Sequence, residues 1–390
     1  MKAITRTVWV LSFVSLFTDM ASEMLYPIMP IYLKSIGFSI VLIGVLEGVV
    51  EATAGLSKGY FGKLSDSTGK RMPFVQWGYA LSALSKPLMA IFIFPAWVFF
   101  VRTIDRIGKG LRTGARDAIL SDEATKETKG KVFGFHRSMD TIGAVLGPLF
   151  ALIYLQYHPA DYQTLFYIAF IPGLLAVGCA LLMKDKNVQP KKANIKISFF
   201  SFLGYWKNSP VMYRKLILGL LAFTLFNSSD IFLLLKAKEA GIKDTAVISI
   251  YIFYNIVCVL FAYPLGILAD KIGLKKIFIL GLFIFAIVYA SMAYSTLPYQ
   301  FYIIFFLYGI YAAATDGISK AWISNIAAKE DTATAIGTYT AFQSICTMIA
   351  SSLAGVIWYK FGSSVTFILS AIMVALVTLY VFFFVVERKT

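Results

Sequence analysis

The stretch Gly62-Lys-Leu-Ser-Asp66-Ser-Thr-Gly69-Lys70-Arg71 has a second copy in the chain, Gly266-Ile-Leu-Ala-Asp270-Lys-Ile-Gly273-Leu-Lys-Lys276. Both glycines and the aspartate keep one offset of 204 residues, and basic residues close both copies. Glycine permits a tight turn and a close approach of two helices, while aspartate can cap a helix or pair with a cation. A repeat that occurs once in each half of the chain predicts two structurally related halves.

The sequence around the two copies is that of a membrane protein. Of its 390 residues 58% are apolar and 15% are charged, and the mean hydropathy is +0.74, whereas a soluble domain has about 45–50% apolar and about 25% charged residues. Apolar runs recur that are long enough to cross a bilayer as helices, which excludes a soluble enzyme. Three single cysteines and two histidines suggest no disulfide framework and no polyhistidine metal centre. Because neither a phosphate-binding loop nor a nucleophile–base pair is evident, we expect no enzyme and no cofactor.

Twelve candidate spans predict an all-α membrane protein. Their limits are 8–34, 41–62, 73–94, 96–120, 132–154, 164–183, 214–235, 245–268, 277–296, 301–324, 335–359 and 364–386. The first is expected to remain as a helix, because no small-residue cleavage site ends it. The longest polar connection divides the spans six and six, which predicts an N-terminal bundle over 1–183, a cytoplasmic linker over 184–213 and a C-terminal bundle over 214–390. The aromatic stretch 197–206 of the linker is expected to lie on the membrane surface.

Lysine and arginine in the connections predict the orientation. One side collects 22 of them and the other side 5, namely Lys34, Lys236, Lys238, Lys243 and Lys360. Because cytoplasmic connections are enriched in these residues, we expect both termini in the cytoplasm, in a multi-pass protein of the plasma (inner) membrane. The net charge of +15 is then mainly an orientation signal, so nucleic acid is not an expected partner.

The Gly-x-x-x-Asp-x-x-Gly-basic pattern, in the loop after the second span of each half, resembles the signature loop of the major facilitator superfamily. The span count and the central linker extend this resemblance over the whole chain. It implies the major facilitator fold, with two pseudo-symmetric six-helix bundles, alternating access, usually a monomer, and spans 1, 4, 7 and 10 around a central cavity. It also implies a gating loop, made of Gly62, Asp66, Gly69, Arg71 and Asp270, with Glu127 as the partner of Arg71. The alternative is that this loop is only a turn whose basic residues anchor it on the cytoplasmic side.

Ionisable residues at membrane depth cost about 2.5–3.5 kcal/mol each and usually face a cavity or a partner. The predicted substrate- and proton-binding set is Asp19, Glu23, Glu47, Glu51, Arg102, Asp105, Arg106, Asn227, Asp230, Asp316 and Lys320, with His136, Arg137 and Asp140 as proton-relay candidates. Several lie one helical turn apart, such as the pairs 19/23, 47/51, 105/109 and 316/320. Because the four acids of spans 1 and 2 cannot all be ionised cheaply, we expect one of them to carry a proton. The alternative is that these charges are ion pairs that hold helices in register, with Lys86 on Glu47 or Glu51.

A closer resemblance rests on Asp19-Met-Ala-Ser-Glu23, Asp105-Arg-Ile-Gly-Lys109 and Gly134-Phe-His-Arg-Ser-Met-Asp140. This set resembles a bacterial efflux-permease-like subgroup that includes nickel-resistance permeases. It implies a proton-coupled secondary transporter that exports a small polar or charged solute by antiport, and the Gly143-Ala-Val-Leu-Gly147-Pro148 motif favours export. Three alternatives stay open: an uptake symporter for an organic anion, zwitterion or siderophore-like metal chelate; a divalent metal exporter; and a membrane receptor or assembly protein without transport. The expected partners are a small-molecule or ion substrate, the proton and the lipid bilayer.

Overall fold

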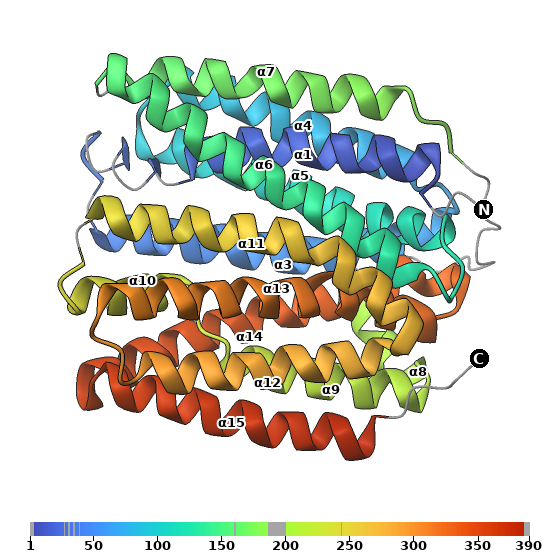
Figure 1. The fold of residues 1–390 in the computed structure, drawn as a ribbon. Coiled ribbons are helices and arrows are strands. Elements are labelled where there is room, and N and C mark those ends of the chain that lie inside the picture. The colour runs from blue at the N-terminus through green and yellow to red at the C-terminus, as the bar shows by residue number, and fades with distance from the viewer. Residues whose placement is uncertain are drawn as a thin grey trace. The chain divides into compact units, whose positions relative to one another are not determined.

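The computed structural model describes residues 4–26, 28–29, 32–33, 36–38, 40–159, 161–185, 200–242 and 244–385. Twelve helices of 16 or more residues make up most of this part of the chain (Figure 1). They are α1 (Arg6–Leu25), α3 (Ile40–Thr68), α4 (Met72–Ile91), α5 (Pro95–Asp122), α6 (Lys129–Tyr157), α7 (Tyr162–Leu181), α9 (Val211–Phe226), α11 (Asp244–Ile272), α12 (Leu274–Met292), α13 (Pro298–Ile326), α14 (Thr332–Phe361) and α15 (Ser363–Phe384). The short elements are η1 (Ser201–Leu203), α8 (Gly204–Asn208), α10 (Ile231–Glu239) and η2 (Lys329–Asp331).

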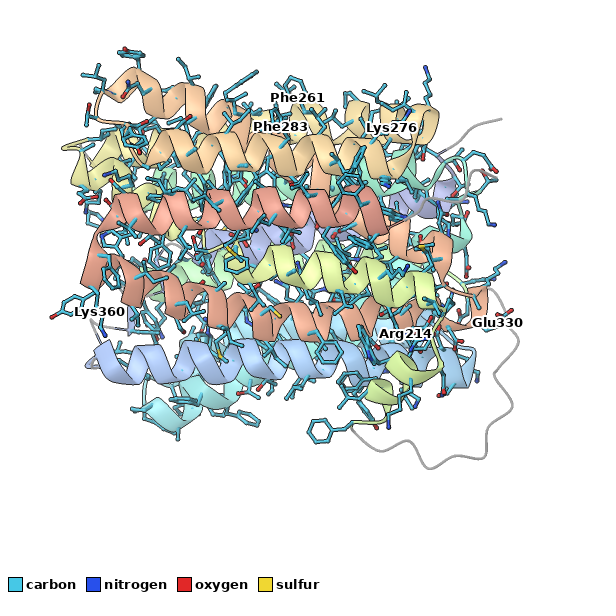
Figure 2. All side chains as sticks on the ribbon, turned by 90° about the horizontal axis from the view of Figure 1, so that it is seen from below. Arg214, Phe261, Lys276, Phe283, Glu330 and Lys360 are labelled. Carbon is cyan, nitrogen blue, oxygen red and sulfur yellow. The ribbon has the colours of Figure 1, made fainter. Side chains whose placement is uncertain are left out.

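The side chains along these helices fit a lipid environment. In the described residues, stretches on α1, α6, α7 and on α11 to α15 are long and apolar enough to cross a membrane, eight in all. Figure 2 shows Phe261 and Phe283 along the helices, whereas Arg214, Lys276 and Lys360 lie at helix ends. Phe283 is 59% exposed. Apolar flanks with charged ends are what a bilayer requires of a helical protein.

Two predicted spans differ most from the observed helices. The first is predicted to run to residue 34, but α1 ends at Leu25, two residues before Pro27, because a proline has no backbone N–H with which to continue the helical hydrogen bonds. The seventh is predicted as one helix over 214–235, but the non-helical residues 227–230, Asn-Ser-Ser-Asp, break it into α9 and α10. Side chains of these types bond to nearby backbone groups and compete with the helix.

Two compact units divide the chain. Unit 1 comprises Met1–Glu123, Met139–Asn208 and Ala327–Ser344, and unit 2 comprises Ala124–Ser138, Ser209–Ile326 and Ile345–Thr390. The first turns of α6 therefore belong to unit 2, and the first turns of α14 belong to unit 1. The six-helix bundles over 1–183 and 214–390 stay a prediction, since the two units follow contacts and not sequence halves.

Each unit has its own buried core. In unit 1, Phe166 of α7 packs edge-on against Tyr32 at 5.0 Å between ring centroids, within an apolar cluster that includes Met24 and Leu46. In unit 2, Phe285 and Tyr289 of α12 stack at 4.0 Å and are fully buried. These cores hold the helices of each unit in place, and with them the polar side chains on those helices.

Candidate functional site

Asp105 of α5 bonds to side chains of two helices in unit 1. Its Oδ1 accepts hydrogen bonds from Lys86 Nζ at 2.9 Å and from Ser85 Oγ at 3.2 Å, both on α4. Arg106 Nε lies 3.9 Å from its Oδ2, and Arg102 also acts on it electrostatically. Lys86 therefore pairs with Asp105, whereas the ion-pair alternative from the sequence gave Glu47 or Glu51 as its partner. A buried acid among cations from two helices is the arrangement expected of an ion pair that fixes helix register.

A second polar cluster of unit 1 joins α1, α5 and α6. Ser15 donates a hydrogen bond to Asp140 and accepts one from Arg116 Nη1 at 3.2 Å. Arg116 also pairs with Asp117 at 2.9 Å, and both residues are buried. The α1–α6 contact itself is tight, because a Cβ on Gly147 would lie 2.5 Å from the Met20 carbonyl oxygen. Asp140 is thus held against α1.

Asp19 lies one turn after Ser15 on α1, in the same polar region. The charged groups close enough to act on its carboxyl group are Asp140, Glu23, Lys109 and Arg112. Asp19 and Glu23 are both partly exposed. Three carboxyl groups with two cations form a set that can bind and release a proton. Glu47 and Glu51 lie on α3, but their side chains are outside the described residues.

The break in the seventh span brings polar groups of unit 2 together. Asp230 Oδ1 accepts a hydrogen bond from the Tyr308 hydroxyl at 2.6 Å, and Asn227 Nδ2 donates to the Tyr311 hydroxyl at 2.9 Å. Ser228 Oγ lies 3.3 Å from the Tyr289 hydroxyl. Tyr308 and Tyr311 are on α13, so Asn227 and Asp230 both bond to the helix of the predicted tenth span.

Tyrosine rings around this break were not predicted from the sequence. Tyr254 and Tyr311 flank Tyr308, each with its ring centroid 5.1 Å from that of Tyr308, and Phe285 contacts Tyr311 at 4.9 Å. All of these side chains are buried. Tyrosine is common at membrane interfaces and in cores, so composition alone does not single them out. Their signal in the sequence is one-turn spacing, which places 308 and 311 on one face of a helix.

The predicted relay residues of α6 separate in the structure. Arg137 Nη2 pairs with Asp316 Oδ2 at 2.8 Å in unit 2, and both side chains are partly exposed. Asp140 bonds to Ser15 in unit 1 instead, so the one-turn spacing of Arg137 and Asp140 does not mark a shared partner. His136 is buried, and Lys320 is half-buried on α13. Asp316 is therefore an ion-pair partner of α6.

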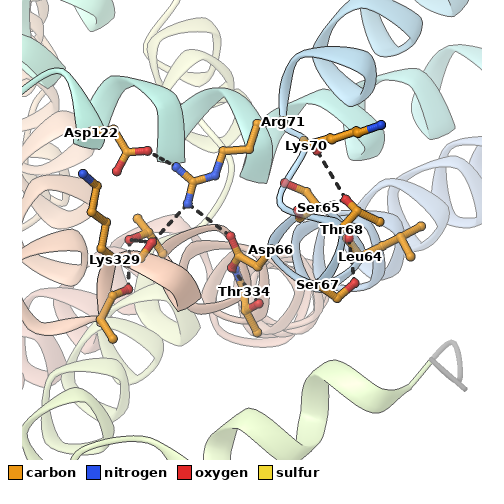
Figure 3. Close-up of polar contacts among 12 residues, drawn as sticks. Leu64, Ser65, Asp66, Ser67, Thr68, Lys70, Arg71, Asp122, Lys329 and Thr334 are labelled. Atoms are coloured by element: carbon orange, nitrogen blue, oxygen red, sulfur yellow. Dashed lines mark hydrogen bonds and ion pairs between the residues drawn. The ribbon is translucent and has the colours of Figure 1, made fainter. Parts of the chain in front are cut away.

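The first loop motif joins α3 to the beginning of α14 within unit 1, a contact that we call the motif junction (Lys58–Asp66 with Ala333–Gly337). Asp66 Oδ2 accepts hydrogen bonds from the backbone N–H of Thr334 at 2.7 Å and from its hydroxyl at 2.8 Å (Figure 3). Asp66 thereby caps the first turn of α14, where backbone N–H groups lack helical partners. The two helices touch at glycines, since a Cβ on Gly62 would lie 2.5 Å from the Ala333 carbonyl oxygen.

Arg71 closes this junction. Its guanidinium bonds to Asp122, to Asp66 Oδ1 at 3.3 Å and to the Lys329 carbonyl oxygen at 3.1 Å (Figure 3). Asp122, the last residue of α5, is thus a partner of Arg71, a role that the sequence analysis gave to Glu127. Glu127 is exposed and belongs to unit 2. Glu127 was implied by the family resemblance, whereas the acids that Arg71 contacts are Asp66 and Asp122.

The second motif copy makes the equivalent junction in unit 2. Asp270 of α11 accepts hydrogen bonds from the backbone N–H groups of Gly130 and Lys131, both at 2.7 Å, and so caps the start of α6. The last glycine of each copy turns the chain after its helix, because Gly69 and Gly273 have φ values of +65° and +109° that favour glycine. In the motif the first glycine therefore lies at a helix contact. The aspartate caps a helix, and the last glycine makes the turn.

Burial raises the pKa of Asp66 to about 6, although the Arg71 guanidinium and the hydrogen bonds from Thr334 act in the opposite direction. Asp66 lies in the last turn of α3, beyond the predicted span 41–62. Its carboxyl group can therefore change protonation near neutral pH in this conformation. Among the described residues no group of three or more His, Cys, Asp or Glu side chains could hold a metal ion.

The sequence of the chain is similar to those of known membrane transporters. A family model described as Major Facilitator Superfamily matches residues 11–253 and 231–390. A Methanocaldococcus jannaschii protein described as an uncharacterized MFS-type transporter is 34% identical over 380 residues, which are 95% of this chain and 93% of that protein. A multi-drug resistance efflux pump homolog of Lactococcus lactis is 21% identical over 362 residues, 88% of this chain and 87% of that protein.

Solved structures are similar over nearly the whole chain. A human organic anion transporter aligns with a TM-score of 0.81 at 14% identity, covering 98% of this chain and 100% of its own. A fucose:proton symporter of E. coli aligns with a TM-score of 0.77 at 13% identity, covering 98% and 99%. At such identity the likeness concerns the fold alone, and it confirms the predicted fold.

Proposed function

Since the chain belongs to the major facilitator superfamily and is thus a multi-pass membrane protein and secondary transporter, we propose that it exchanges protons for a small polar or charged solute, and that it exports this solute. No enzymatic activity is involved. The efflux pump among its distant relatives supports export, as does the resemblance of its first, fourth and fifth spans to efflux permeases. Both termini are placed in the cytoplasm by this proposal, which rests on the distribution of lysine and arginine.

The observation that carries proton coupling is the group of acids around Asp19. Asp19, Glu23 and Asp140 come from α1 and α6, and Lys109 and Arg112 from α5 act on the same carboxyl group. Acids near membrane depth are costly when ionised, and cations nearby lower that cost. A proton bound to this group would be released when a charged solute or a helix movement changes the electrostatic interactions between these acids and the nearby cations. We assign proton binding to Asp19 and Glu23, with Glu47 and Glu51 as further members.

Substrate contacts are proposed for the two polar regions named above. Around Asp105, the cations Arg102 and Arg106 offer donors for an acidic group of the solute. At the broken seventh span, Asn227 and Asp230 offer an amide and a carboxylate among tyrosine hydroxyls. Discontinuous spans often carry the substrate site of transporters, because their irregular backbone exposes polar groups. Acidic and basic contacts together favour a zwitterion, an organic anion or a metal chelate over an apolar compound.

The two loop motifs are proposed to gate the motif end of the protein. In the described conformation Asp66 and Asp270 each cap a helix that begins in the other sequence half. Alternating access would require these caps and the glycine contacts to break. The described state is then the one in which the motif end, proposed to be cytoplasmic, is closed.

Transport into proteoliposomes under an imposed pH gradient tests this proposal. An organic anion, a zwitterion, a metal chelate and a divalent metal ion would be offered in parallel. For an antiporter, an acidic lumen drives uptake, because protons leave as the solute enters. If an acidic exterior drives uptake instead, the protein is a symporter and export is wrong. If neither gradient matters, and Asp19→Asn and Glu23→Gln transport normally, the proton assignment fails.

A further inference from the structure

Residues 200–208, at the end of the linker, bind the motif junction of unit 1 through one buried ring. Phe202 is 1% exposed and lies against Gly59 of α3, where a Cβ would come within 2.7 Å of the ring. The ring therefore occupies the space that any side chain at position 59 would fill. Its neighbour Leu203 is 40% exposed, so the burial of Phe202 does not extend to the next residue of η1.

The same segment also contacts α14. The Phe202 carbonyl oxygen accepts a hydrogen bond from Thr338 Oγ1 at 3.5 Å, and the Trp206 ring meets Phe342 edge-on at 6.4 Å. Tyr205 is buried, and its hydroxyl has Asp331 and Asp66 as charged neighbours. One short segment thus touches α3, which precedes the linker, and α14, which belongs to the other sequence half.

We propose that residues 200–208 form a latch that holds the motif junction closed, with Phe202 inserted at Gly59 as its fastening. When α3 and α14 separate, the segment cannot keep both its Gly59 and its Thr338 contacts, so each opening must expose the Phe202 ring or give up the contacts with α14. The latch rests on alternating access, which the superfamily shares, and not on the assignment of the proton-binding acids.

The distance between α3 and α14 tests the latch directly. Spin labels on Lys70→Cys and Glu330→Cys, both exposed positions of unit 1, would report junction distances in a protein whose native cysteines are replaced by serine and which is held in lipid nanodiscs. Burial of a phenylalanine ring predicts that Phe202→Ala raises the ratio of long to short distances about tenfold or more. Leu203→Ala is the matched control and should leave the distribution unchanged.

Gly59→Ala provides a second route to the same result. Its methyl group would displace the Phe202 ring and should also favour long distances, and combination with Phe202→Ala should add nothing, because the clash needs the ring. Unchanged distributions in Phe202→Ala and Gly59→Ala would overturn the latch, and so would effects that simply add in the double variant. Because the readout needs neither substrate nor a proton gradient, a failed latch and a failed proton assignment give different results.

Discussion

At Gly62 a single methyl group decides whether α3 and α14 can meet. A Cβ there would lie 2.5 Å from the Ala333 carbonyl oxygen, and a Cβ on the facing Gly337 would lie 2.5 Å from the Lys58 carbonyl oxygen. We predict that Gly62→Ala destabilises the closed junction by about 2 kcal/mol, as overpacking usually does, while the open state gains the better helix propensity of alanine. The spin-label pair at 70 and 330 should report longer distances.

Gly178 supplies the control for this substitution. It lies on α7 and has no heavy atom within 4 Å of the position that an added methyl group would take, so Gly178→Ala should leave both the distances and the stability of the fold unchanged. Equal distance distributions for Gly62→Ala and the unsubstituted protein would show that the two helices accommodate the added methyl group. The close contact at Gly62 would then play no part in gating.

Asp66 makes the junction sensitive to pH. Its pKa is raised to about 6 by burial when the junction is closed and should return toward about 3.8 when the side chain meets water. The closed state then holds the proton more tightly than the open state. Protonation of Asp66 therefore stabilises the closed junction fully below the open-state pKa, and this stabilisation is lost as pH rises through 6. Between pH 7 and pH 5 the closed-to-open ratio should rise roughly tenfold. Distances recorded at both pH values check this, and Asp66→Asn should abolish the pH dependence; an opposite sign would contradict the assignment.

The broken seventh span is the element in which substitutions should change the apparent affinity for the solute. Tyr308 donates to Asp230 across the break at 2.6 Å, and a hydrogen bond to a charged group contributes about 1.5–3 kcal/mol. Tyr308→Phe leaves the Asp230 carboxyl group without this donor, so it is predicted to raise the KM of transport about tenfold or more and also to lower the thermal stability of the protein. Tyr302→Phe, on the same helix but 38% exposed and in ring contact with Phe253, is the matched control. A KM that stays unchanged in Tyr308→Phe would remove the break from the substrate path.

Elements differ in how well the sequence predicts them. The helices and most of their limits follow from apolar runs, because a bilayer forces each such run to satisfy its backbone internally. The break at 227–230 was missed because a 20-residue average hides four polar residues, although Asn, Ser and Asp in succession are poor helix formers. Asp122 was missed as a partner of Arg71 for another reason: the expected partner, Glu127, was taken from the family resemblance, and the sequence alone does not show which acid at or after the end of α5 reaches the guanidinium.

For the whole molecule, the repeated loop motif was the most informative feature of the sequence. It predicted related halves and the family, and the structure gives the glycines and the aspartate of both copies the same roles. Which intramembrane charges pair could not be read from spacing within one helix, since Lys86 with Asp105, and Arg137 with Asp316, join different helices. Spacing fixes the face of a helix, whereas pairing depends on which helix lies opposite.

Proton movement coupled to solute movement is the central claim, and one measurement tests it most directly. Proteoliposomes containing a pH-sensitive dye would receive a transported solute from outside, and the lumenal pH would be followed. We predict that the lumen becomes alkaline as solute enters, that Asp19→Asn abolishes this change, and that Glu330→Gln, which alters an exposed acid, preserves it. Accumulation of solute at unchanged lumenal pH in the unsubstituted protein would contradict the account.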